Sequence, residues 1–250
     1  MIQLSANLGF LWKDRALPDA IRAAKAAGFD AVECHWPYEM PAADVRAALD
    51  ETGLSMLGLN TRRGREGENG LSAMPGRESE ARAAIDEAFD YGSEIGAGAV
   101  HVMAGASRGV EGAREAFLEN LAYAADLGGK YGMVVLIEPL NARDAPGYFH
   151  QTVEEAADIV GALGRPEVRI MFDLYHQQIM GGDLVRRFER HRDLVGHVQF
   201  AAVPSRAEPD EGEVAFERLL PALGWSGPFG AEYRPRAGTD DGLGWMRAYR

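Results

Sequence analysis

The sequence predicts an α/β protein with one domain over residues 1–250, folded as a single (β/α)8 barrel, the TIM barrel. Strand-like and helix-like segments alternate eight times along the 250 residues, so each βα unit takes about 31 residues. Helical crossovers force neighbouring strands to run parallel, and eight units of this length favour a closed barrel. An open doubly wound sheet is the alternative, but no Gly-x-Gly-x-x-Gly motif follows an early strand, which disfavours a dinucleotide-binding sheet.

Short apolar runs mark the strands. The clearest is Met133–Ile137, an uninterrupted apolar run of the kind found in parallel strands that are buried on both faces. The predicted strands, in chain order, are Ile2–Leu8, Phe29–His35, Leu54–Thr61, Ala99–Met103, Met133–Ile137, Val168–Asp173, Val195–Ala201 and Pro228–Glu232.

Apolar residues at helical spacing mark the helices between the strands, as at Ile85, Ala88 and Phe89. One helix begins with a capping-box sequence, in which Thr152 and Glu155 satisfy free backbone amides. Glycine follows many of the helices, which suits the left-handed conformation that commonly ends a helix. The predicted helices, in chain order, are Leu17–Ala27, Ala42–Thr52, Arg77–Ile95, Glu111–Tyr131, Thr152–Leu163, Leu184–Asp193, Phe216–Leu223 and Asp241–Tyr249.

Composition and charge exclude several classes of partner. The chain has 26 basic and 38 acidic residues, a net charge of −12, which repels nucleic acid and anionic lipid, so we expect neither nucleic acid nor membrane as a partner. No apolar run approaches the roughly 18 residues of a membrane span. The first residues lack the pattern of a secretion signal, and we expect a cytoplasmic protein. The single cysteine, Cys34, reads as a buried, inert thiol. A homo-oligomer is left open, because no interface signature is present.

Oxygen ligands stand at the ends of the last four strands. In this barrel the active site lies at the carboxyl ends of the strands. Four consecutive strands each offer one ligand there: Glu138, Asp173, Gln199 and Glu232. Carboxylates after apolar runs are costly unless they are paired or bound to a metal. Three carboxylates and an amide oxygen suit Mg²⁺ or Mn²⁺, whereas zinc would bring more histidine or cysteine.

The motifs around these residues resemble those of the hydroxypyruvate isomerase family, within the xylose isomerase-like barrels that also contain ketose 3-epimerases. The resemblance covers essentially the whole chain and rests on the following motifs: Ser5-Ala6-Asn7-Leu8, Leu71-Ser72-Ala73-Met74-Pro75-Gly76-Arg77-Glu78, Ile137-Glu138-Pro139-Leu140-Asn141, Pro146-Gly147-Tyr148-Phe149, Asp173-Leu174-Tyr175-His176-Gln177-Gln178, Gly196-His197-Val198-Gln199, Glu232-Tyr233-Arg234-Pro235 and Gly244-Trp245-Met246-Arg247.

The resemblance implies specific roles for these residues. One divalent metal ion is implied, with this set of ligands: Glu138, Asp173, Gln199 and Glu232. Glu138 and Glu232 are implied to be the catalytic pair, and His176 to contact a substrate oxygen. Arg206 and Asn7 are further candidates for substrate contact. In one stretch the chain departs from the family, which usually has Ala-Asp-Asn-Pro where this sequence has Ala201-Ala202-Val203-Pro204. The loss of these two polar groups affects the expected identity of the substrate more than it affects the expected metal ligands.

The resemblance implies an isomerase that converts hydroxypyruvate, a short 2-keto-3-hydroxy acid, to its aldehyde isomer 2-hydroxy-3-oxopropanoate. One glutamate removes a C–H proton, the other serves the opposite side or the neighbouring carbon, and the metal stabilises the enediolate that forms between.

Cations near the site are needed to bind an acid. With three carboxylates and one divalent ion the bare site carries a formal charge of −1, which repels a small anionic hydroxy-keto acid. Four basic residues in loops after the strands are candidates for binding its carboxylate: Lys13, Arg62, Arg63 and Arg206. His35 and His101 are candidates for lining the pocket, and His197 is expected one layer deeper.

Other functions compete with this prediction. A 2-oxo-tetronate isomerase or a ketose 3-epimerase would use the same two glutamates and metal, although a neutral ketose needs no arginines. A metallohydrolase of the same barrel type, such as an apurinic endonuclease, needs several zinc ions and a basic face, which the oxygen-rich ligand set and the net charge of −12 disfavour. A non-catalytic binding protein is disfavoured by the complete set of four ligands.

Overall fold

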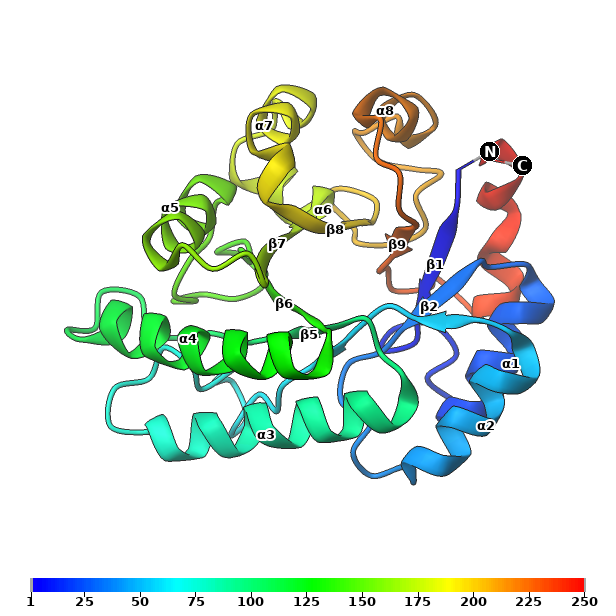
Figure 1. The fold of residues 1–250 in the computed structure, drawn as a ribbon. Helices are drawn as coiled ribbons and strands as arrows, with labels where there is room; N and C mark the ends of the chain where they lie inside the picture. The colour runs from blue at the N-terminus through cyan, green and yellow to red at the C-terminus, as the bar shows by residue number, and fades with distance from the viewer. Residues whose placement is uncertain (1, 250) are drawn as a thin grey trace.

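A ring of parallel strands enclosed by helices forms the structure, a computed structural model in which residues 2–249 are described (Figure 1). The strands, in chain order, are β1 Leu4–Asn7, β2 Ala31–Glu33, β3 Ser55–Met56, β4 Leu59–Asn60, β5 Ala99–His101, β6 Val134–Ile137, β7 Val168–Asp173, β8 Val195–Phe200 and β9 Phe229–Ala231. Every strand pair is parallel, and the predicted α/β barrel is confirmed.

The third predicted strand, Leu54–Thr61, is broken into β3 and β4. β3 pairs with β2, and β4 pairs with β5, so the chain changes neighbour between the two halves. The backbone bond from Gly98 N to Met56 O, 3.0 Å long, joins the two sides of the break. The nine short strands therefore make the eight-stranded ring that the βα repeat predicts.

Helices cover the outside of the ring (Figure 1). They are α1 Leu17–Ala27, α2 Ala42–Thr52, α3 Glu78–Ile95, α4 Ala113–Tyr131, α5 Val153–Leu163, α6 Leu174–Met180, α7 Leu184–His191 and α8 Phe216–Leu223. The predicted capping box at Thr152 and Glu155 is confirmed. α6 was not expected from the sequence, and it begins because the Asp173 side chain accepts a hydrogen bond from Tyr175 N. The last predicted helix is a 3₁₀ helix over Thr239–Tyr249.

A hydrophobic core fills the space between the strands and the helices. Its residues come from nearly the whole sequence, from Leu4 to Tyr249. Cys34 is buried in it, as expected, and burial raises the pKa of its thiol. Most polar side chains that are buried come from the strand ends or the loops that follow them. Within residues 2–249, no helix has both the length and the hydropathy that crossing a membrane requires.

Candidate active site

A cavity of about 290 Å³ opens at the carboxyl ends of the strands. Its lining includes Glu138 after β6, His176 in α6 and Glu232 after β9. His35 and His101, which follow β2 and end β5, also line it, as the sequence suggested. The site therefore lies where the barrel architecture predicts it.

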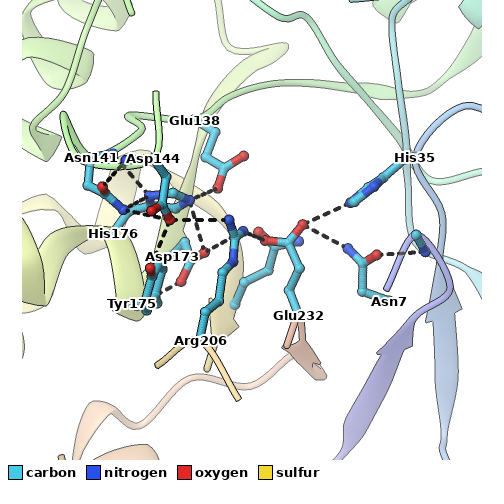
Figure 2. A network of polar contacts seen from close by, with 12 residues as sticks. Asn7, His35, Glu138, Asn141, Asp144, Asp173, Tyr175, His176, Arg206 and Glu232 are labelled. Carbon is cyan, nitrogen blue, oxygen red and sulfur yellow. Dashed lines mark hydrogen bonds and ion pairs between the residues drawn. The ribbon is translucent and has the colours of Figure 1, made fainter. Parts of the chain in front are cut away.

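Three carboxylates and one imidazole converge beside this cavity. One ligand atom from each of four buried residues lies within 4.8 Å of the others: Glu138, Asp173, His176 and Glu232. Figure 2 shows these side chains pointing toward one another, and they come from the ends of β6, β7 and β9. This cluster is able to hold a metal ion, and it contains three of the four ligands that the sequence predicts.

Several buried acceptor atoms in or near this cluster have no hydrogen-bond partner within residues 2–249. They are Glu138 Oε1, Asp173 Oδ2 and Gln199 Oε1. A buried polar atom without a partner costs free energy, and a buried charge without one costs much more. A divalent cation held by the cluster would satisfy the Glu138 and Asp173 oxygen atoms together, and Gln199 lies on the neighbouring strand in register with Asp173, so the donor set fits a hard cation.

The cluster changes the pKa values of two of its carboxyl groups. Burial, followed by repulsion from Glu232 and Asp173, raises the pKa of Glu138 well above its usual range. Burial and the Glu232 charge also raise the pKa of Asp173, to about 7. A bound cation acts in the opposite direction, because a nearby positive charge favours the ionised form.

Glu232 is held as a carboxylate by three neighbours. Its Oε1 accepts from Asn7 Nδ2 at 3.1 Å and pairs with His35 Nε2 at 2.9 Å. Its Oε2 accepts from Arg206 at 2.8 Å. Burial alone would raise the pKa of Glu232, but the Arg206 charge and the His35 contact hold this pKa well below its usual range. Asn7 is thus placed against a predicted catalytic residue.

Arg206 is the buried cation of the site. Its guanidinium lies 2.8 Å from Glu232 and 3.6 Å from Asp144 (Figure 2). It also lies 4.9 Å from the centre of the Phe10 ring and 5.0 Å from that of the Tyr175 ring. Its backbone has a φ of 57°, a left-handed conformation that is uncommon for residues other than glycine and often marks functional positions. Burial would lower the pKa of Arg206, but Glu232 and Asp173 raise it above its usual value. Arg206 therefore stays charged.

The tautomer of His176 follows from its hydrogen bonds. The backbone N–H of Asn141 donates to His176 Nδ1 at 3.0 Å, so Nδ1 carries no proton. The proton of the neutral ring is then on Nε2, which lies 3.7 Å from Glu138 Oε1 and 3.6 Å from Asp173 Oδ2. Burial and the Arg206 charge lower the pKa of His176 to about 3, so the ring is neutral. It presents an N–H donor to the site, which suits a contact with a substrate oxygen better than metal ligation.

Gln199 lies on β8 in register with Asp173 on β7, and it is buried. Its side chain borders a smaller space of about 10 Å³ inside the barrel, beside the main cavity. His197, also on β8, contacts Glu33 in that deeper layer, as the sequence suggested.

The four predicted loop cations occupy different places. Arg206 is at the centre of the site, and Arg63 lines the cavity with its guanidinium 5.0 Å from the Trp36 ring. Arg62 instead forms two hydrogen bonds to Glu87 of α3, 2.6 and 2.9 Å long. Lys13 lines two hollows on the neighbouring surface. The structure thus does not bring Arg62 or Lys13 to the cavity.

Three residues that shape the site were not predicted from the sequence. Arg234 lines the cavity, Asn141 sets the His176 tautomer, and Asp144 pairs with Arg206. Arg234 and Asn141 stand inside the motifs that carry Glu232 and Glu138, which was the available signal. Nothing in the sequence pattern indicated Asp144.

The chain belongs to the Xylose isomerase-like TIM barrel family, whose pattern it matches over residues 21–249. Its similarity to named relatives covers the full length. A 2-oxo-tetronate isomerase of Cupriavidus necator is 43% identical over 100% of this chain and 99% of the relative. A Xenopus laevis protein, provisionally named as a hydroxypyruvate isomerase, is 42% identical over 99% of this chain and 96% of its own.

A solved structure agrees with this assignment of the fold. The crystal structure of a Brucella melitensis protein, described as an AP endonuclease of family 2, is 38% identical, has a TM-score of 0.95 and covers 100% of both chains. The relatives with isomerase names and the shared family make this chain an isomerase.

Proposed function

We propose that the protein is a divalent-metal isomerase that interconverts a short 2-keto-3-hydroxy acid, hydroxypyruvate, and its aldehyde isomer 2-hydroxy-3-oxopropanoate. The observation that carries this is the group of three buried carboxylates at the ends of β6, β7 and β9, two of which have oxygen atoms that lack partners among the described residues. The names of the relatives support the substrate class. The four-carbon 2-oxo-tetronate is the second candidate, because the 43% identical relative bears that name.

Four oxygen ligands would hold the metal ion, Mg²⁺ or Mn²⁺: Glu138, Asp173, Gln199 and Glu232. A bound divalent cation would supply Lewis-acid stabilisation of the negative charge that develops on the substrate oxygens. His176 is left out of this set because its Nε2 carries a proton.

The two glutamates move the proton between neighbouring carbons. We assign removal of the C–H proton to Glu232, because Arg206, His35 and Asn7 keep this group ionised without help from a cation. Glu138, whose ligand atom lies within 4.8 Å of the other members of the cluster, delivers a proton to the neighbouring carbon, and the proton of the substrate hydroxyl passes to the former carbonyl oxygen. His176 Nε2 donates a hydrogen bond to a substrate oxygen.

The charge around the cavity fits an acid. Two arginines line the cavity without an ion pair to any carboxylate of residues 2–249: Arg63 and Arg234. With Arg206 they give three guanidinium groups against four carboxylates, Glu138, Asp144, Asp173 and Glu232. A divalent cation changes this formal balance from −1 to +1, so a monoanionic substrate is attracted. We propose that Arg63 and Arg234 bind the substrate carboxylate.

Arg63→Met and Arg234→Met should each lower kcat/KM for hydroxypyruvate by about 10- to 100-fold, mainly through KM, because a charge-assisted hydrogen bond is lost. Arg62→Met is the matched control, since Arg62 pairs with Glu87 outside the cavity, and it should change kcat/KM less than about 3-fold. Steady-state kinetics measure all three. Unchanged KM in both cavity variants would refute carboxylate binding by these arginines and favour a neutral ketose.

His176→Asn should lower kcat about 100- to 1,000-fold, because a hydrogen-bond donor to the reacting oxygen is lost. Calorimetric titration with Mn²⁺ should give nearly the same Kd as for the unchanged protein, since the ring is not a ligand. His191→Asn, on the outer helix α7, is the control for kcat. A loss of Mn²⁺ affinity in His176→Asn would instead show that His176 ligates the metal.

Competition among substrates tests the proposed function. The values of kcat/KM should be at least 100-fold higher for hydroxypyruvate or 2-oxo-tetronate than for a ketohexose such as D-fructose. A higher value for the ketose would overturn the proposal in favour of a 3-epimerase. Cleavage of an abasic-site oligonucleotide, without turnover of any of these compounds, would favour the hydrolase alternative.

A further inference from the structure

A second buried polar cluster lies inside the barrel next to the carboxylates. Glu33, the last residue of β2, meets His197 and Gln199 of β8. The Oε2 atom of Glu33 accepts hydrogen bonds from His197 Nε2 at 2.9 Å and from Gln199 Nε2 at 3.0 Å. All three side chains are buried, and none of the proton-transfer steps above uses Glu33.

Glu33 reaches Gln199 across the inside of the barrel. β2 and β8 are not neighbours, because β1 and β9 lie between them. On β9 the path is open only because residue 230 is glycine: a Cβ there would lie 2.2 Å from Glu33 Oε1 and 2.9 Å from His197 Nε2. The backbone at Gly230 does not have a positive φ, so the space and not the conformation requires glycine.

The contact with Glu33 decides which way the Gln199 amide faces. Gln199 Nε2 donates to Glu33 Oε2 at 3.0 Å, so the NH₂ group of the amide is turned toward Glu33. The carbonyl oxygen then faces away from Glu33, and it is one of the buried acceptors without a partner among residues 2–249. A carboxylate ligand offers oxygen on both sides, whereas an amide that rotates by half a turn presents N–H groups to a cation. Among the four proposed ligands, only Gln199 needs a second group to choose its orientation.

We propose that Glu33 is a positioning residue that fixes the Gln199 amide so that Oε1 is presented to the metal ion. This role rests on the metal site of the proposed function. Gly230 is required for the same contact, because its lack of a side chain leaves the space that the Glu33 side chain occupies. Groups that orient a metal ligand in this way commonly contribute about 10- to 100-fold to metal affinity.

The test measures Mn²⁺ binding to the metal-free protein by electron paramagnetic resonance, without substrate. Glu33→Met, which removes the acceptor at similar size, should weaken the Kd for Mn²⁺ by about 10- to 100-fold. Glu33→Gln, which keeps an acceptor oxygen, should lose less affinity than Glu33→Met. Circular dichroism confirms that each variant is folded.

A double-mutant cycle separates orientation of Gln199 from a general structural effect. In the Gln199→Ala background, Glu33→Met should cause no further loss of Mn²⁺ affinity beyond about 2-fold, because the amide is already absent. Equal losses in both backgrounds would show that Glu33 acts by another route and would overturn the proposal. An unchanged Kd in Glu33→Met would overturn it as well.

Gly230→Ala reaches the same contact without altering Glu33 or Gln199. The added methyl group would lie 2.2 Å from Glu33 Oε1 and 2.9 Å from Gln199 Cγ, so it must displace the contact between these two side chains, and Mn²⁺ affinity should again fall about 10-fold or more. Gly161→Ala in α5, where a Cβ meets nothing within 4 Å, is the matched control and should leave the Kd unchanged. If the unchanged protein binds no Mn²⁺, the metal site itself fails; if it binds Mn²⁺ and Gly230→Ala binds it equally well, only the role of Glu33 fails.

Discussion

Replacing Glu138 or Glu232 by glutamine should lower kcat for hydroxypyruvate by at least about 1,000-fold, because each change removes a proton-transfer group and a charged metal ligand. Glutamine keeps the size of the side chain but has no basic carboxylate. In Glu232→Gln the amide must also face Arg206, His35 and Asn7, which are arranged around a carboxylate. The measurement is steady-state kcat at saturating Mg²⁺.

The control for this pair is Glu119→Gln, an exposed residue of α4, which should keep the kcat of the unchanged protein. The two site variants should stay folded, since they relieve repulsion among buried carboxylates as well as removing contacts. If either retains more than a tenth of the original kcat at saturating Mg²⁺, that glutamate does not carry the proton.

Removing divalent metal by chelation should abolish turnover, and adding Mg²⁺ or Mn²⁺ should restore it. Binding should also stabilise the fold: a cation at 100 times its Kd adds about 2.7 kcal/mol. In a chain of this size each kcal/mol shifts Tm by about 2–4 °C, so Tm should rise by roughly 5–10 °C. Calorimetric scans with and without metal measure this shift.

The shift in Tm should depend on pH in a defined direction. Protons compete with the cation for Asp173, whose pKa burial and Glu232 raise to about 7 in the metal-free site. The group is increasingly protonated as the pH falls through 7, so the metal-induced shift should shrink from pH 8 to pH 5. Asp173→Asn should show a smaller shift at pH 8 than the unchanged protein. Full turnover after complete removal of divalent metal would contradict the account.

The positions of the site carboxylates could be predicted because the βα repeat fixes where each strand ends. Glu138, Asp173 and Glu232 follow or end apolar strands, and the barrel brings those ends together whatever the loops do. The partners of these groups could not be predicted in the same way. Arg62 and Arg63 are adjacent in a loop, yet one pairs with α3 and the other lines the cavity. No periodicity governs which way a loop side chain points.

Contacts between strands that are not neighbours could not be predicted from the sequence either. Glu33 on β2 and Gln199 on β8 meet because Gly230 leaves space between them, and this depends on the interior packing of the whole ring. The break between β3 and β4 also depends on tertiary hydrogen bonds, whereas the short helix α6 begins at a local N-cap, the Asp173 side chain. The tautomer of His176 is set by one backbone amide, that of Asn141, which only the folded loop brings within reach.

The most direct test of the central claim follows hydroxypyruvate by proton NMR in D₂O, with the protein in Mg²⁺ and again after chelation. We expect conversion to 2-hydroxy-3-oxopropanoate that requires the metal, with deuterium entering at carbon and with neither event in Glu138→Gln or Glu232→Gln. Absence of both conversion and exchange with every divalent ion tried, while 2-oxo-tetronate is also left unchanged, would contradict it.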